Sequence, residues 1–265
     1  MIKASNTDKK EILELLQNVI IENVYLYIDV LNENIESESV AVWLQRAEGK
    51  ITQIVLQYHG SFQIYSQADQ SDYTGILNLI NDINPSMISA ETSIIRNLYK
   101  DLSFMYKETY GRVLKQPYVK DLPSNVGVEF ANADNMLEIA ELICSDKGIG
   151  EHYEPHDLQM QFIQRLADGN GRNLIIKQDD KIVAHYATYA EAPGIAVMGG
   201  LIVLPEYRGK GYARYLHSYL ANMLIEENMT PVLFCHDEVV LSMYKKLKVI
   251  DCSGYGKLTK IPGVY

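Results

Sequence analysis

The sequence predicts an α/β (α+β) protein in two parts, because two patterns recur along it. Short apolar runs of strand length alternate with longer amphipathic segments of helical period. The order three strands, helix, strand, helix occurs once in each half of the 265-residue chain. A hydrophobic content of 47% suffices for a core in each half. We therefore expect a smaller first α/β domain over residues 1–120 and a second domain over residues 121–265.

The first half opens with a predicted helix from about Lys9, which Asn6-Thr7-Asp8 is expected to cap and whose apolar face runs on to Val24. The segment Thr109–Asn125 holds one glycine and two prolines, and we expect it to be a linker. The other predicted elements of this half are the strands Val40–Ala47, Ile51–Tyr58 and Ser61–Ser66, a helix Tyr73–Ile83, a short strand Met87-Ile88 and a helix Glu91–Lys100.

The second half alternates in the same way. A loop, Cys144–Glu154, separates its first two predicted helices and carries several acidic residues. The predicted elements are a strand Val126–Phe130, a helix capped by Asn132 or Asp134, a helix His156–Ala167, the strands Asn173–Gln178, Lys181–Tyr189 and Ile195–Leu204, a helix Gly211–Glu227, a strand Pro231–His236 and a helix Glu238–Leu247.

The turn between the third of these strands and the following helix has the chemistry of an anion site. The first N–H groups of a helix have no partner within the helix and carry the positive end of its dipole. Gly209 and Gly211 let a ligand approach the backbone closely, while Arg208 and Lys210 add positive charge. This combination suits a phosphate or pyrophosphate.

The turn also fits the pattern R-x-x-G-x-A, formed by Arg208, Gly211 and Ala213 after Val203-Leu204-Pro205. This segment resembles the pyrophosphate loop of the GNAT superfamily of acyl-CoA N-acyltransferases, and the resemblance extends from about Val126 to the C-terminus. It implies a mixed, mostly antiparallel sheet flanked by helices.

The two-part arrangement is similar to that of glycine N-acyltransferase-like proteins. It implies that the first domain is a degenerate GNAT-like repeat without the phosphate loop. Asp69 and Asp72 stand where such a loop would lie, and they would repel a pyrophosphate. An unrelated α+β domain is the alternative.

The resemblance implies acetyl-CoA or another acyl-CoA as co-substrate, and no metal. In this family the strand before the loop carries a bulge and splays from its neighbour, and Gly199-Gly200 is the place for that bulge. The implied cofactor-binding residues are Leu201, Ile202, Val203, Arg208, Gly209, Lys210, Gly211, Tyr212, Ala213, Asp237 and Tyr244.

The resemblance also assigns a general acid. Tyr244 stands where the family places the tyrosine that protonates the departing thiolate. The general base stays open among Glu151 and Glu154 in the loop and His236 at the end of a strand, because Ile195–Leu204 contains no acid. The chain departs from the family at Asp237, where Asn is usual, at Val240, where a small residue is usual, and at Lys248-Val249, where Gly-Phe is usual.

The resemblance implies an N-acetyltransferase that acts by direct attack on the thioester, and we expect a primary amine of a small molecule or amino acid as acceptor. A non-catalytic acyl-CoA-binding protein and a protein-lysine acetyltransferase are the alternatives. The net charge of −10 argues against nucleic acid as a partner. Three cysteines without metal-ligand spacing, a first segment without a signal-peptide core and no membrane-length apolar run predict a cytoplasmic protein without membrane contact. A homodimer is compatible with the sequence.

Overall fold

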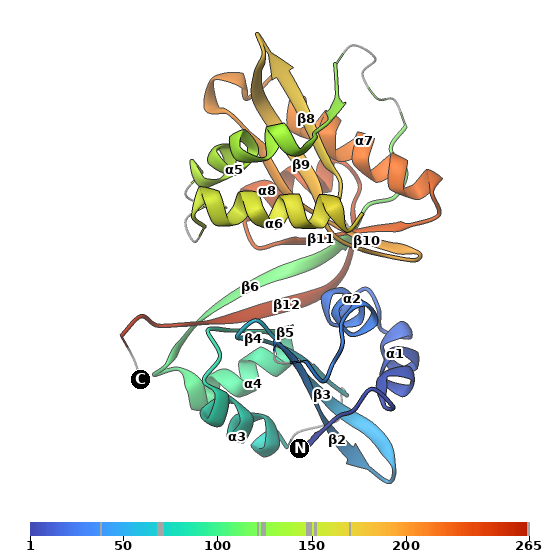
Figure 1. Ribbon diagram of the computed structural model, residues 1–265, viewed down its shortest axis with the longest axis vertical. Coiled ribbons are helices and arrows are strands. Elements are labelled where there is room, and N and C mark those ends of the chain that lie inside the picture. The colour runs from blue at the N-terminus through green and yellow to red at the C-terminus, as the bar shows by residue number, and fades with distance from the viewer. Residues whose placement is uncertain are drawn as a thin grey trace. The chain divides into compact units, whose positions relative to one another are not determined.

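A computed structural model describes residues 1–37, 39–67, 72–120, 122, 126–146, 150, 153–169 and 171–263 (Figure 1). The chain divides into two compact units, which we describe one at a time. Unit 1 comprises Met1–Val113, Cys235–Glu238 and Asp251–Tyr265, and unit 2 comprises Leu114–Phe234 and Val239–Ile250.

The strands of unit 1 form a mixed sheet in the order β1-β2-β3-β4-β5-β12-β6. The first four pair antiparallel in sequence, β4 and β5 run parallel, and β12 pairs antiparallel with β5. The strands are β1 (Ile2–Lys3), β2 (Val40–Ala47), β3 (Lys50–Tyr58), β4 (Ser61–Ser66), β5 (Met87–Glu91), β6 (Tyr106–Lys115) and β12 (Ile250–Lys260).

Four helices cover the two faces of this sheet: α1 (Lys9–Gln17), α2 (Val24–Asn32), α3 (Thr74–Ile83) and α4 (Thr92–Leu102). Successive strand residues point to opposite faces. Ile54 and Leu56 of β3 accordingly belong to the core beneath α1 and α2, whereas Val55 belongs to the core beneath α3 and α4. The continuous run of buried residues in β3 follows from this two-sided cover.

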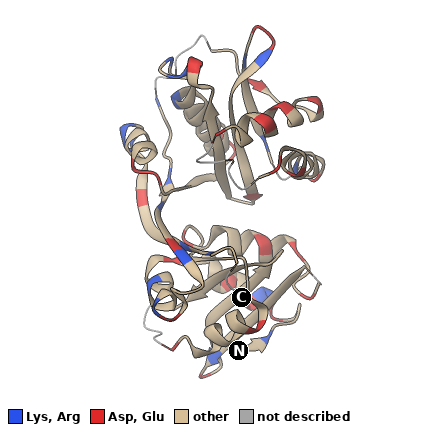
Figure 2. Ribbon diagram, turned by 90° about the vertical axis from the view of Figure 1, so that its left-hand side faces the viewer, with Lys and Arg blue, Asp and Glu red and all other residues tan. Residues whose placement is uncertain are grey.

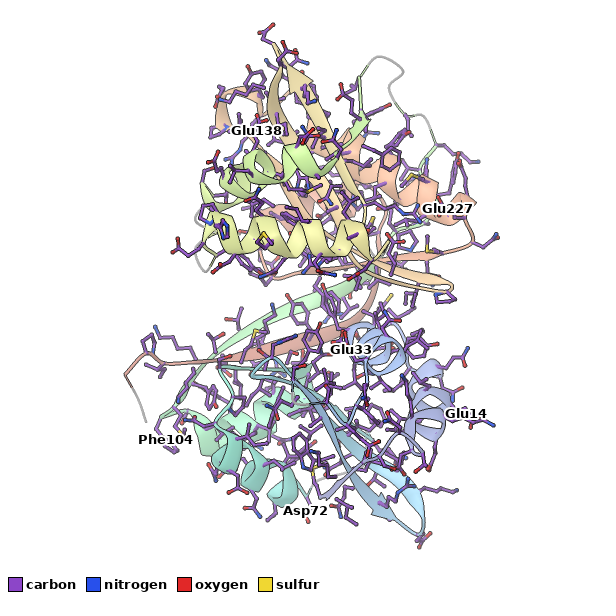
Figure 3. All side chains as sticks on the ribbon, viewed as in Figure 1. Glu14, Glu33, Asp72, Phe104, Glu138 and Glu227 are labelled. Atoms are coloured by element: carbon purple, nitrogen blue, oxygen red, sulfur yellow. The ribbon has the colours of Figure 1, made fainter. Side chains whose placement is uncertain are left out.

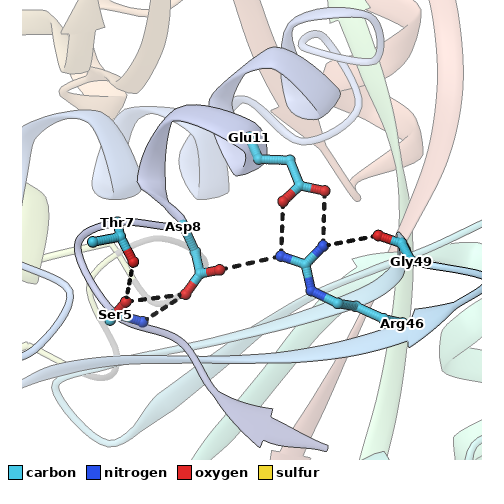
Figure 4. Close-up of polar contacts among 6 residues, drawn as sticks. All are labelled: Ser5, Thr7, Asp8, Glu11, Arg46 and Gly49. Atoms are coloured by element: carbon cyan, nitrogen blue, oxygen red, sulfur yellow. Dashed lines mark hydrogen bonds and ion pairs between the residues drawn. The ribbon is translucent and has the colours of Figure 1, made fainter.

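The start of α1 confirms the predicted position but shows a different set of bonds (Figure 4). Asp8 is the N-cap residue, yet its carboxylate makes no capping bond and instead accepts from the Ser5 N–H at 2.9 Å. Arg46 donates to both Asp8 and Glu11, which joins the helix to β2. The prediction of one apolar face running to Val24 was wrong, because α1 ends at Gln17 and Val24 begins the unforeseen α2.

The predicted linker Thr109–Asn125 was wrong in its first part, because β6 runs through it to Lys115. Gly111 does not break this strand. A Cβ at Gly111 would lie 2.5 Å from the Tyr255 ring and 2.6 Å from the Cys235 carbonyl oxygen, so the glycine is needed for close packing within unit 1. The strand β12 was not predicted at all, and it joins the sheet of unit 1 although it comes from the C-terminal end of the chain.

Unit 2 has the strand order β11-β10-β9-β8-β7, with β10 and β11 parallel and the other neighbours antiparallel. Its predicted elements are confirmed within one to three residues at nearly every end. They are β7 (Glu129–Phe130), a 3₁₀ turn (Ala133–Asn135), α5 (Met136–Cys144), α6 (Pro155–Ala167), β8 (Asn173–Gln178), β9 (Lys181–Ala192), β10 (Ile195–Val203), a 3₁₀ turn (Pro205–Tyr207), α7 (Tyr212–Glu226), β11 (Thr230–Cys235) and α8 (Glu238–Lys246).

Helices cover both faces of this sheet as well. Phe162 of α6 contacts the His185 ring on one face of β9, and His217 of α7 contacts Tyr186 on the other face. Side chains also join helix ends to the sheet (Figure 3). Glu138 of α5 accepts from the Ile182 N–H at 2.7 Å, and Glu227 after α7 binds Arg172 at 2.6 Å.

The two units share one order of elements: a strand, two helices, three strands, a helix, a strand and a helix. The predicted fold class, with its mixed and mostly antiparallel sheet flanked by helices, is confirmed. Acidic and basic residues are interspersed along the ribbon of each unit (Figure 2). In the part of the chain that the structure describes, no helix is both long and apolar enough to span a membrane.

Candidate functional site

The strand β10 is irregular at the predicted place. Its pairing with β9 shifts register between Gly199 and Ile202, so the predicted bulge at Gly199-Gly200 is confirmed. Its parallel pairing with β11 runs from Ile195 to Met198 and is not continued by the residues that follow. Within the part of the chain that the structure describes, the last part of β10 therefore keeps β9 as its neighbour and has no strand partner on the β11 side.

The bulge is packed tightly against one aromatic ring. A Cβ at Gly199 would lie 2.7 Å from the Tyr189 ring, and a Cβ at Gly200 would lie 2.3 Å from the Tyr189 hydroxyl oxygen. Gly200 also has a φ of 68°, in the left-handed region. Both sterics and backbone conformation thus require glycine here, and Tyr189 holds the bulge from the α6 face.

The glycines of the loop after β10 have free space beside them, whereas the glycines of the bulge are tightly packed. Gly209 and Gly211 have φ values of 80° and 85°, and a Cβ at either position would meet nothing within 4 Å. These glycines serve the backbone turn and leave free space beside it. No hydrogen bond to a backbone acceptor is recorded for the N–H groups of residues 209–214, all of which are described. A row of donors without a backbone acceptor therefore lies at the N-terminus of α7, as an anion site requires.

The two cations of the loop differ in their contacts. Arg208 donates from Nε to the Val203 carbonyl at 3.0 Å and from Nη2 to Asp146 at 3.3 Å, which braces the loop against the end of α5. A small cavity of about 50 Å³ lies beneath this brace, between residues 142–146 and 202–208. Lys210 lies 4.5 Å from the centre of the Tyr207 ring and is otherwise exposed. Lys210 is thus the cation more readily available to a bound anion.

His185, which sequence reasoning missed, is fully buried next to the bulge. Its Nδ1 lies 3.0 Å from the Gly200 carbonyl oxygen, and its Nε2 lies 2.9 Å from Oδ1 of Asn173. Burial lowers the pKa of His185 to about 4, so the ring is neutral at pH 7. The sequence offers no signal for this role, since only the fold brings β9 beside the bulge.

The general-acid candidate Tyr244 lies in the core of unit 2 with 5% of its surface exposed. Its ring packs on His217, with 4.9 Å between ring centres. Both N–H groups of Gln116 donate to the carbonyls of Pro117 and Leu247. The Gln116 oxygen must therefore accept from His217 Nε2, at 2.8 Å.

This arrangement fixes the protonation of the ring. The Nδ1 atom of His217 accepts from the Tyr186 hydroxyl at 3.2 Å. Burial lowers the pKa of His217 to about 3 and keeps the ring neutral. Tyr244 thus stands against a rigid, uncharged partner, and its role as general acid stays a prediction.

Two of the three candidate bases, Glu154 and His236, lie among the described residues, and they belong to different units. Glu151 lies outside the described residues. Glu154 is exposed at the start of α6. His236 and Asp237 are exposed in the short connection between β11 and α8, which belongs to unit 1. No group of three or more His, Cys, Asp or Glu side chains among the described residues is placed to hold a metal ion.

Residues 136–248 match the profile of the acetyltransferase (GNAT) family. They span unit 2 from α5 to the end of α8, together with Cys235–Glu238 of unit 1, and include both the bulge and the glycine loop. Among curated proteins, none matches the chain in sequence.

Solved structures resemble nearly the whole chain. A Drosophila protein has a TM-score of 0.69 at 15% identity, over 99% of this chain and 98% of its own. A tandem GNAT protein from the clavulanic acid biosynthesis pathway has a TM-score of 0.63 at 9% identity, over 98% and 97%. A GCN5-related N-acetyltransferase-like protein from Streptococcus suis has a TM-score of 0.61 at 13% identity, over 94% and 99%. At these identities the likeness shows the fold.

Proposed function

We propose, because residues 136–248 match the acetyltransferase (GNAT) family, that this protein transfers an acyl group from acetyl-CoA or another acyl-CoA to a primary amine. The acceptor is a small molecule or an amino acid. The observation that carries the proposal is the combination of the bulge in β10, the end of its pairing with β11 and the open glycine loop directly after it. Together they offer backbone donors along a path that a long anionic ligand can follow.

Each group of residues has its own role in binding or in proton transfer. The N–H groups of residues 209–214 bind the pyrophosphate, with Lys210 adding charge. On the side away from β9, the backbone of Leu201–Val203 has no partner in β11 among the described residues, and only the Val203 carbonyl is taken up, by Arg208. This stretch aligns the pantetheine arm in the manner of a missing β-strand. A bound acyl-CoA supplies the thioester that the amine attacks. Tyr244 donates its phenolic proton to the departing sulfur, and Glu151, Glu154 or His236 accepts the proton of the amine.

A non-catalytic acyl-CoA-binding protein is the second candidate, and one observation favours it. The strand β10, Ile195–Val203, contains no acidic residue that could act as a base next to the bulge. This candidate predicts tight binding of acyl-CoA without turnover.

Thiol release from acetyl-CoA, measured across a panel of amines, amino acids and lysine peptides, separates these readings. Turnover with a small amine supports the proposal, turnover with peptides alone supports protein-lysine acetylation, and binding without turnover supports the second candidate. Calorimetry identifies the loop. Gly211→Asp places a carboxylate in the anion site, and CoA affinity should fall by at least about tenfold.

Gly194→Asp is the matched control for this variant. Gly194 has a φ of 83° against 85° for Gly211, and both have open space around them. The two substitutions therefore carry similar backbone strain, but Gly194 lies in the β9–β10 turn. Equal CoA affinity in the two variants and the wild type would show that the loop does not bind the pyrophosphate.

A further inference from the structure

The buried ring of His185 has a defined donor. The Gly200 carbonyl oxygen, 3.0 Å from Nδ1, has lone pairs and no proton. Nδ1 must therefore carry the hydrogen and donate. Since the ring is neutral, Nε2 is then an acceptor. Asn173 meets this need once its amide is turned by 180°, which preserves its shape and places the NH₂ group where Oδ1 stands at 2.9 Å.

This hydrogen bond orients a peptide group in the bulge. A trans peptide directs its C=O and its N–H to opposite sides, and the chain has no cis peptide among the described residues. The Gly200 carbonyl points to His185 on β9, so the Leu201 N–H of the same peptide points away from β9. At that level the recorded pairing with β11 has already ended at Met198. The Leu201 N–H therefore faces the unpaired side of β10.

Two side chains of β9, Tyr189 and His185, hold this peptide from the α6 face. The Tyr189 hydroxyl lies where a Cβ of Gly200 would be, and the His185 ring packs on Phe162 of α6 at 5.9 Å between ring centres. Without these contacts the Gly200–Leu201 peptide could rotate easily, because glycine has many accessible backbone conformations. His185 is a fully buried polar side chain, and its Nδ1 hydrogen bond goes to this carbonyl.

We propose that His185 is a positioning residue, which fixes the Gly200–Leu201 peptide so that the Leu201 N–H donates to the carbonyl oxygen of the thioester. This inference rests on the proposed function. It deepens that function by naming the side chain that aims a backbone donor of the bulge at the oxygen that gains negative charge during attack. His185 itself touches neither the substrate nor the reacting atoms.

The test compares two variants with the wild type. His185→Leu removes the donor, and turnover at saturating substrates should fall by about 10- to 100-fold, since loss of a whole oxyanion donor costs ~10²–10³. The affinity for free CoA should stay within about threefold, because the pyrophosphate loop is untouched. His185→Asn places an amide NH₂ near the position of Nδ1 and should restore most of the turnover. A purely structural role would not separate turnover from CoA affinity in this way.

Asn222→Leu is the control for stability alone. Asn222 is a buried side chain of α7 that bonds both the N–H and the C=O of Val119, and neither residue belongs to the bulge or the glycine loop. It should lower the melting temperature without a selective loss of turnover.

The inference is overturned if His185→Leu turns over like the wild type, or if the Leu and Asn variants are equally impaired while folded. A direct measurement covers the case in which the variants do not fold. In the ¹⁵N-labelled wild type, the Leu201 amide signal should shift further downfield with a non-hydrolysable acetyl-CoA analogue than with CoA. Equal shifts refute the inference. A wild type that neither binds nor turns over acyl-CoA refutes the proposed function itself, which is a different result from turnover that is indifferent to His185.

Discussion

The two units place the same elements around two very different strands. In unit 1, β4 pairs with β3 without any register shift and continues parallel to β5 as far as Ile64. In unit 2, β10 occupies the corresponding position, yet it shifts register at Gly199-Gly200. The comparison is confined to the strands, because residues 68–71 between β4 and α3 lie outside the described part.

The difference shows that one bulge in a strand separates the candidate site of unit 2 from the regular sheet of unit 1, although both units share the same order of elements. A regular strand satisfies its backbone groups through its neighbours, whereas a bulge re-aims them. The helices after the parallel strands differ in the same sense. The seventh residue of α8 is Tyr244, and the seventh residue of α4 is the fully buried Leu98. We therefore expect chemistry in unit 2 and packing alone in unit 1.

Tyr244→Phe should give the largest effect. The substitution keeps the ring on His217 and removes only the hydroxyl, so general acid catalysis worth ~10²–10⁴ in turnover should be lost. CoA affinity should change little. Steady-state rates at saturating substrates measure this, with Tyr99→Phe in unit 1 as the control. Equal rates for Tyr244→Phe and the wild type would assign the proton to another group.

Gly200→Ala should be next, at about 2–5 kcal/mol of unfolding free energy, because left-handed strain adds to the clash with Tyr189. Gly60→Ala, before the regular β4, has a φ of 81° and open space, so it should cost only about 1–2 kcal/mol. Urea unfolding of both variants measures the contrast. Adding Tyr189→Phe to Gly200→Ala should recover part of the lost unfolding free energy, because it removes the hydroxyl that clashes. No recovery would mean that the Tyr189 ring moves aside without a free-energy penalty.

The two units should respond to acid with opposite sign. In unit 1, burial raises the pKa of Asp29 to about 6, which favours the protonated folded form. This group therefore adds stability as the pH falls from about 6 to 4, by about 1–3 kcal/mol. In unit 2, burial lowers the pKa of His185 and His217 to about 4 and 3, so their contribution is lost as the pH falls below 6.5.

The single tryptophan, Trp43, lies in β2 and makes the first half of this prediction measurable. The urea midpoint of unfolding can be measured from Trp43 fluorescence at pH 5 and at pH 7. The contribution of Asp29 raises the midpoint at pH 5 relative to pH 7 in the wild type, and this contribution should be missing in Asp29→Asn. Hydrogen exchange of β9 should show weaker protection at pH 5. Identical pH profiles of the wild type and Asp29→Asn would contradict the buried, protonated carboxyl.

The smallest effects concern two arginines that brace helix ends. Arg46→Gln should cost about 0.2–1 kcal/mol of unfolding free energy, as is usual for partly exposed ion pairs, and leave CoA affinity unchanged. Arg208→Gln should cost a similar amount, but it should also weaken CoA binding by a few-fold, because Arg208 holds the loop to Val203 and Asp146. An affinity change for Arg46→Gln, or none for Arg208→Gln, would break the assignment of binding to unit 2 alone.

Local patterns in the sequence determined most of the elements and the position of the loop. Period, turn residues and the glycines at 209 and 211 depend on neighbours within a few residues, and the structure places β2, β4 and β8 at the predicted bounds. The bulge was also expected, because the resemblance to the GNAT superfamily implies one before the loop and Gly199-Gly200 is the place for it. The division into domains at residue 120 stays a prediction.

Only the tertiary structure decided which distant residues meet. It sends β12 from the C-terminal end into the sheet of unit 1, uses Gly111 for close packing rather than a break, and sets His185 against the Gly200 carbonyl. These contacts join residues that are 15 to more than 140 positions apart, and each depends on burial and on hydrogen-bond pairing. Burial and hydrogen-bond pairing between distant residues arise only when the core assembles, so no local sequence pattern could predict these contacts.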